Sequence, residues 1–181
     1  MQMLGAGGLP LLADTRRAPD RHNPRGYFEL DLVRRPGAES AWIDRARGRA
    51  VKVVVPRILD LPPGGPYRVL FLHRAVAEVA ASQRALLEGA GAEPEVPASR
   101  MAEMLAVLRD RARAELGARP DTRILDVEHR ALLFSPRREA ARIARFLDLE
   151  LDLGAMAARV EPALFRHRAG GSPGRARPGC A

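Results

Sequence analysis

The order of apolar and polar residues along the chain predicts an α/β domain. Three short runs, at 50–55, 69–72 and 123–127, read as strands. The first is expected to be buried, and the apolar, partly β-branched run at 69–72 is expected to be buried on both faces. Apolar residues recur at helical spacing directly after the second run, over 99–116 and in a helix that begins at Pro136. Because strands alternate with helices, the pattern favours a parallel sheet covered by helices in three layers.

Shorter segments extend this pattern towards both ends of the chain. Residues 1–6 read as the end of a helix that two glycines stop, and 42–49 as a short helix or turn. Asp152 is placed to cap a last helix that runs through Val160. We therefore expect one domain over 1–168, followed by a disordered tail, rich in Gly, Pro and Arg, over 169–181.

Composition narrows the function classes. The formal net charge of +8 and the isoelectric point of about 11.1 would suit a nucleic-acid-binding protein. However, the arginines are scattered among acids, and only two Tyr and one Trp are available for base stacking. A polyanionic small molecule is therefore a better expected partner than nucleic acid. With no apolar run near the roughly 18 residues of a membrane span, and Cys180 as the single cysteine, we expect no membrane partner and a cytoplasmic protein.

Two polar residues follow the strand predicted at 69–72. Arg74 lies at the carboxyl end of that strand, and Ser82 lies about two turns into the next helix. Ligands of parallel sheets bind beyond the carboxyl ends of the strands, where helix N-termini attract anions. A guanidinium and a hydroxyl placed there suit a phosphate group. From the spacing alone, the alternative stays open that Arg74 solvates a strand end and Ser82 is an ordinary surface residue.

Taken in order, three motifs of this chain resemble the bacterial branch of the sulfotransferase family. They are NPRGYFE at 23–29, KVVVP at 52–56, and an arginine, Arg74, followed eight positions later by a serine, Ser82. The resemblance implies a P-loop NTPase-like fold, with this arginine and serine on the 3′-phosphate of the donor 3′-phosphoadenylyl sulfate (PAPS). The implied activity is transfer of the sulfuryl group to a hydroxyl or amine of a small-molecule or glycan acceptor, with no metal.

The resemblance also implies further donor-binding residues. His129, in HRALLFSP, takes the position of a family aromatic residue that contacts the donor adenine. Arg166 and Arg168, in LFRHRAGG, resemble the basic segment that closes over the 3′-phosphate. A metal is not expected, because the four histidines are far apart in the sequence and lack partners at ligand spacing.

For catalysis, the resemblance implies Lys52 and Glu29. Lys52 is a candidate for stabilising charge on the transferring group, whereas Val54 stands where many relatives have their general-base histidine. Glu29 is then the remaining candidate base, since some sulfotransferases use a glutamate in this early region, and a buried carboxylate can serve.

The family's first strand and its Gly-Ser-rich phosphate loop are not found, because the chain opens at MQML, which resembles the helix that follows them. The resemblance therefore implies an N-terminally truncated member. Such a chain is either a weak or inactive sulfotransferase or a non-catalytic nucleotide-binding relative. A basic nucleic-acid-binding protein is the third alternative.

Overall fold

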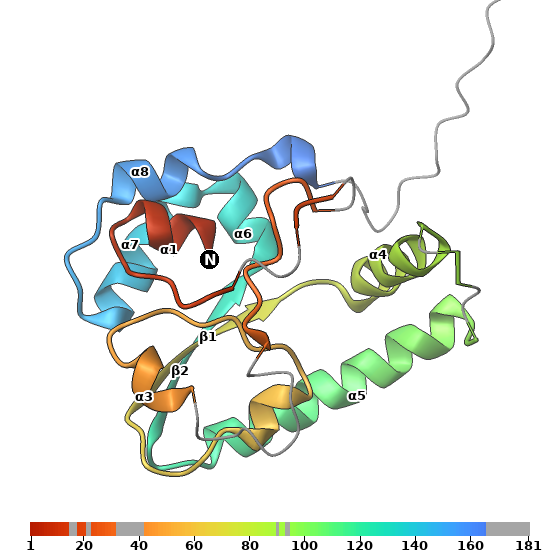
Figure 1. Cartoon of the computed structure of the whole chain (residues 1–181), viewed down its shortest axis with the longest axis horizontal. Helices are drawn as coiled ribbons and strands as arrows, with labels where there is room; N and C mark the ends of the chain where they lie inside the picture. Colours follow the sequence, from red (N-terminus) through yellow and green to blue (C-terminus); the bar gives the residue numbers. More distant parts are fainter. Residues whose placement is uncertain (15–17, 21–22, 32–41, 90, 93–94, 166–181) are drawn as a thin grey trace, which may run out of the picture.

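A parallel pair of strands forms the centre of the molecule (Figure 1). The computed structural model describes residues 1–14, 18–20, 23–31, 42–89, 91–92 and 95–165. Strand β1 (Tyr67–His73) pairs with β2 (Thr122–Glu128) along its whole length. The connection between them contains α4 (Val76–Gly89) and α5 (Ala98–Gly117). The chain is therefore α/β, as the apolar pattern predicts.

The remaining described elements are short, except for one helix near the C-terminal end. They are α1 (Gln2–Ala6), α3 (Ile43–Ala46), η1 (Arg57–Asp60), α6 (His129–Phe134), α7 (Pro136–Leu147), α8 (Leu153–Ala158) and η2 (Pro162–Leu164). The predicted cap of α8 is confirmed, because Asp152 Oδ1 accepts a hydrogen bond from the Ala155 amide at 2.9 Å. Ser135 precedes α7 as predicted, but its side chain makes no capping hydrogen bond.

Two apolar clusters lie on opposite faces of the strand pair. Phe71 of β1 packs in the first cluster, with Ala112 and Leu116 of α5 and residues of the 42–61 segment. Val127 of β2 packs in the second cluster, with residues of α1, α7 and α8. Figure 1 shows the same division, with α1, α7 and α8 on one side of the strands and α3 and α5 on the other. Because side chains alternate between the two faces along each strand, the strand pair contributes apolar side chains to both clusters.

The strand predicted at 50–55 is wrong. In the described residues, this segment makes one parallel bridge, between Leu11 and Ala50, and then no ladder. Val54 and Val55 are 48% and 36% exposed, because the chain turns at once into η1. Valine content alone does not make a strand where no neighbouring segment pairs with it. The larger, three-layer P-loop NTPase-like sheet therefore stays a prediction.

The burial expected for 69–72 is also wrong in part. Phe71 is buried, whereas Leu72 is 54% exposed. A sheet of two described strands has no central strand, so the carboxyl end of β1 is not enclosed on both faces.

The boundary predicted at 168 and the tail at 169–181 lie outside the described residues. Among the helices that the structure describes, none combines membrane-spanning length with a sufficiently apolar sequence.

Asp121 ties the turn before β2 to the loop before β1. Its carboxylate accepts hydrogen bonds from the amides of Gly64 and Gly65, at 3.1 and 3.3 Å. Arg119 Nη2 donates to the same carboxylate at 2.9 Å, and the Thr122 hydroxyl donates at 3.0 Å. Led by Arg119, these donors hold the pKa of the Asp121 carboxyl well below its ordinary value of 3.8.

A folded-state pKa that is lowered adds stability above the unfolded pKa, and this stability is lost as the pH falls. We expect the melting temperature of the wild type to fall between about pH 5 and about pH 3, and the Asp121→Ala protein to show a smaller fall from a lower neutral value. Circular dichroism melts across this range measure the effect. Asp60→Ala is the control, because Asp60 pairs only with its exposed neighbour on η1, Arg57, among the interactions described. An unchanged pH slope in Asp121→Ala would contradict the assignment.

Candidate functional site

A pocket of about 280 Å³ lies beyond the carboxyl ends of β1 and β2. It is lined by residues from β1 and the start of α4, from α5, and from β2 and the start of α6: His73, Arg74, Ala75, Glu78, Arg109, Glu128, His129 and Arg130. Because the strands are parallel and in register, their last residues meet at one edge of the sheet. This edge is where α/β proteins commonly bind ligands.

Glu78 joins the two sides of this pocket. Its side chain has no exposed surface, and its Oε2 accepts a hydrogen bond from Arg74 Nε at 3.2 Å. Its Oε1 accepts a hydrogen bond from Arg130 Nη2 at 2.9 Å. A carboxylate buried this completely needs cationic partners to offset its lost hydration. Glu78 thereby holds two guanidiniums close together, that of Arg74 in the loop before α4 and that of Arg130 in α6.

Phe165, which follows η2, covers the same group of side chains. The guanidinium carbons of Arg74 and Arg130 lie 5.4 and 5.9 Å from the centre of its ring. The His129 ring meets it edge-on, with the ring centres 5.3 Å apart. Cations are attracted to the face of an aromatic ring at such distances. Phe165 therefore adds an aromatic wall to a group that is otherwise polar.

His129 contributes a neutral ring to the pocket. Burial lowers its pKa, and the nearby charge of Arg74 lowers it further. Its Nδ1 atom is buried and has no hydrogen-bond partner in the described structure. An imidazole held without charge beside two guanidiniums is suited to contact with a flat, uncharged group.

We expect His129→Phe to raise the free energy of unfolding by up to about 1 kcal/mol, because it removes a buried polar atom without a partner and keeps a ring against Phe165. Urea unfolding measures the change. His129→Ala is the matched control, and it is expected to destabilise because the ring contact is lost. A His129→Phe protein that is less stable than the wild type would show that the imidazole makes a necessary polar contact.

A second polar group fixes the carboxyl end of β1 on the α5 side. His73 Nε2 lies 2.8 Å from Asp126 Oδ1. Arg113 of α5 donates to both oxygens of Asp126, each at 2.8 Å. These contacts, with Arg113 the larger cause, lower the pKa of Asp126 to about 2. Asp126 is thus ionised, and the His73 Nε2 atom is assigned as the hydrogen-bearing one.

The two predicted catalytic residues lie together, but they do not line the pocket. Lys52 Nζ is 3.7 Å from Glu29 Oε1 and donates a hydrogen bond to the Tyr27 carbonyl at 2.9 Å. Both side chains are partly exposed. The structure therefore pairs an ammonium and a carboxylate that are far apart in the sequence.

Only some of the predicted donor-binding residues line the pocket. Arg74 and His129 both line the pocket. Ser82 lies one helical turn beyond Glu78 on α4, is partly exposed and is not among the lining residues. Arg166 and Arg168 lie outside the described residues. The structure therefore places Arg74 in the pocket but does not bring Ser82 to it, so the predicted convergence of the two side chains on one phosphate is not seen.

The partners that hold the pocket together were not predicted from the sequence. Glu78 follows Arg74 by four positions, a spacing that favours an ion pair across the start of a helix. Arg130 directly follows His129 and lies in the same motif, HRALLFSP, so the motif that pointed to His129 could also have pointed to Arg130. Phe165 precedes Arg166 within LFRHRAGG, but no local pattern predicts that its ring lies against Arg74, before α4, and Arg130 of α6.

Comparisons with protein-family models, with curated proteins and with solved structures found no match to this chain. Within the part of the chain that the structure describes, no three His, Cys, Asp or Glu side chains come together in a way that would hold a metal ion. The function is therefore inferred from the pocket, its arginines and the motifs of the sequence.

Proposed function

We propose that this chain binds 3′-phosphoadenylyl sulfate and transfers its sulfuryl group to a hydroxyl or amine. The observation that carries the proposal is the meeting of Arg74 and Arg130 in a pocket beyond the carboxyl ends of two parallel strands. Guanidiniums bind phosphate oxygens through parallel hydrogen bonds. The family resemblance of the motifs around Arg74 supports the choice of this donor.

The surroundings of the two arginines suit the nucleotide end of such a donor. Helix α4 begins at the pocket, and the positive end of its dipole favours an anion there. The lining residues include three arginines and two glutamates, so the charge favours an anion modestly. His129 lines the pocket beside the arginines and supplies a flat ring on which an adenine can stack.

In the proposed reaction, the acceptor oxygen or nitrogen attacks the sulfur of the donor. The new bond to sulfur forms as the bond from sulfur to the 5′-phosphate oxygen breaks, and adenosine 3′,5′-bisphosphate leaves. Glu29 takes the proton of the acceptor, and Lys52 stabilises negative charge on the transferring group. Because this pair does not line the pocket, the proposal requires the sulfuryl end of the donor to extend from the pocket to Lys52 and Glu29.

A transfer assay with radiolabelled donor and a set of hydroxyl and amine acceptors tests this function. We expect labelled product that depends on the donor, with one adenosine 3′,5′-bisphosphate released for each transfer. Lys52→Met and Glu29→Gln are each expected to lower the rate about a hundredfold or more. Arg47→Ala is the control, because Arg47 is 70% exposed and pairs with Asp44 on α3.

A non-catalytic nucleotide-binding protein is the second candidate, and the separation of the Lys52–Glu29 pair from the pocket lining favours it. It predicts nucleotide binding that depends on Arg74, with no transfer to any acceptor. A nucleic-acid-binding protein predicts instead affinity for single or double strands that falls steeply with salt and does not change in Arg74→Ala.

A further inference from the structure

We infer that Arg130 is a second phosphate-binding residue of the pocket, and that Glu78 is the positioning residue that orients Arg74 and Arg130 towards one anion. This inference rests on the proposed nucleotide site and assigns separate roles in it to Arg130 and Glu78. It starts from the two hydrogen bonds of Glu78, at 3.2 Å to Arg74 and at 2.9 Å to Arg130.

Glu78 is an unusual residue to bury. Its side chain is wholly covered in the first turn of α4, where an apolar residue would pack at no cost in hydration. Buried ion pairs of this kind contribute little net stability compared with apolar packing. What the carboxylate does provide is orientation, because each arginine side chain is flexible and the two cations repel each other without a shared anion.

The two arginines of the pocket differ in exposure. The Arg74 side chain is 25% exposed, whereas the Arg130 side chain is 56% exposed. Both line the pocket, and the ring of Phe165 lies against both guanidiniums. The Arg130 guanidinium is therefore the more accessible of the two to a phosphate in solution. Each guanidinium carries five N–H donors, so a contact with Glu78 is compatible with a phosphate contact.

A merely structural role for Glu78 and Arg130 is the alternative, because their ion pair also joins α4 to α6. The two roles differ in one measurable quantity. A structural defect lowers the affinity for every ligand of the pocket by the same factor. The loss of a phosphate contact lowers only the preference for a ligand that carries the phosphate.

The experiment is calorimetric titration of the full chain with adenosine 3′,5′-bisphosphate and with adenosine 5′-monophosphate. We expect the wild type to prefer the bisphosphate, and Arg130→Ala to lose about tenfold or more of that preference with a small change for the monophosphate. Glu78→Gln is expected to lose preference in the same way, since it keeps the shape of the side chain and removes its charge. Arg130→Lys is expected to recover part of the preference.

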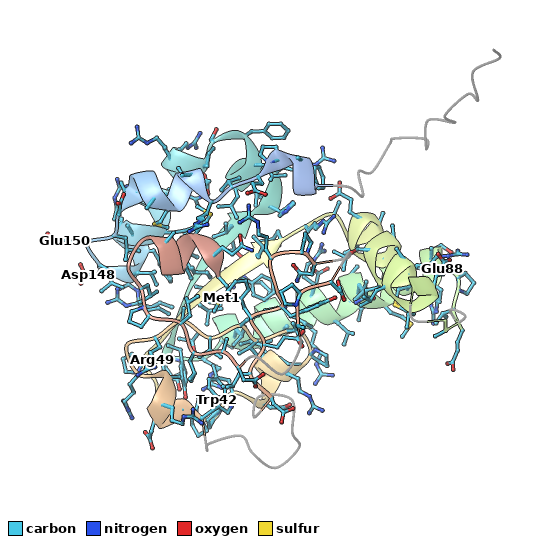
Figure 2. All side chains as sticks on the ribbon, turned by 45° about the horizontal axis from the view of Figure 1, so that its top comes forward. Met1, Trp42, Arg49, Glu88, Asp148 and Glu150 are labelled. Carbon is cyan, nitrogen blue, oxygen red and sulfur yellow. The ribbon has the colours of Figure 1, made fainter. Side chains whose placement is uncertain are left out.

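The control pair lies on the same helix. Arg84 Nε donates to Glu88 Oε1 at 2.7 Å, and both side chains are more than half exposed. Figure 2 labels Glu88 at the outer end of α4, away from the strands. Arg84→Ala and Glu88→Gln are therefore expected to leave the preference unchanged. Melting curves show whether Glu78→Gln folds, and Arg130→Ala tests the inference even if it does not.

The outcomes separate the inference from the function on which it rests. A wild type without preference for the bisphosphate overturns both. A preference that Arg74→Ala abolishes but Arg130→Ala and a folded Glu78→Gln retain overturns the inference and leaves the proposed function standing. An equal loss of affinity for both nucleotides in Arg130→Ala also overturns the inference, because it shows a structural role.

Discussion

Replacing Arg74 by alanine is expected to weaken the binding of adenosine 3′,5′-bisphosphate by about a hundredfold or more. A hydrogen bond to a charged group contributes about 1.5–3 kcal/mol, and an arginine can make two to one phosphate. Two such bonds correspond to at least two factors of ten in affinity. The loss of Arg74 also leaves the buried Glu78 carboxylate without its Nε partner, so the orientation of Arg130 suffers as well.

Calorimetry measures this loss, and Arg84→Ala is its matched control. Arg84 lies on the same helix as Glu78, it is also ion-paired with a residue four positions later, and its partner Glu88 is exposed. We expect the Arg84→Ala protein to bind as the wild type does. Equal affinities of the wild type and the Arg74→Ala protein would remove Arg74 from the binding site.

Leu116→Ala is expected to lower the free energy of unfolding by about 2–5 kcal/mol. Leu116 is 1% exposed, at the end of α5, and it packs in the apolar cluster that also contains Phe71 of β1. Truncation removes apolar contacts and leaves a cavity that the surrounding helix and strand fill only in part. Since a small domain is stable by only about 5–15 kcal/mol, the variant is expected to be close to unfolding at 37 °C.

Urea unfolding monitored by circular dichroism tests this expectation. Val107→Ala is the control, because Val107 lies on the same helix with 68% of its surface exposed. Its free energy of unfolding is expected to change by no more than about 0.5 kcal/mol. Equal effects of the two substitutions would mean that α5 does not pack on the strands through Leu116.

The elements with a clear period were predictable from the sequence. The helix predicted over 99–116 is α5, with bounds one residue wider at each end, and the run at 123–127 lies within β2. Their signals are local, because a run of apolar residues at regular spacing has few alternative structures. The switch of period between 72 and 76 likewise marks the end of β1 and the start of α4.

The segment at 50–55 shows what a local pattern leaves out. Its valines pack against the first apolar cluster through Val51 and Val53, but a strand also needs a neighbour for its backbone. Pairing depends on where the rest of the chain lies, and no residue within the segment carries that information. Val51 and Val53 pack against the core, but Val54 and Val55 are exposed and the backbone of the segment is not a strand.

The candidate site also contains residues that the sequence predicts and residues that it does not. Arg74 and His129 were predicted from separate motifs, and the parallel register of β1 and β2 brings them to one pocket. Glu78 was missed because an acidic residue in the first turn of a helix is ordinary in a sequence. Its complete burial and its bond to Arg130 of α6 depend on contacts between segments that are far apart in the sequence. Sequence spacing thus predicted the cation and not the anion that orients it.

One titration tests the central claim most directly: the wild-type chain with adenosine 3′,5′-bisphosphate, set beside adenosine 5′-monophosphate under the same conditions. The pocket at the ends of β1 and β2 predicts saturable binding with one nucleotide per chain and a preference for the bisphosphate of about tenfold or more. Equal affinities for the two nucleotides, or no binding of either, would contradict the claim that Arg74 and its neighbours form a site for a 3′-phosphate.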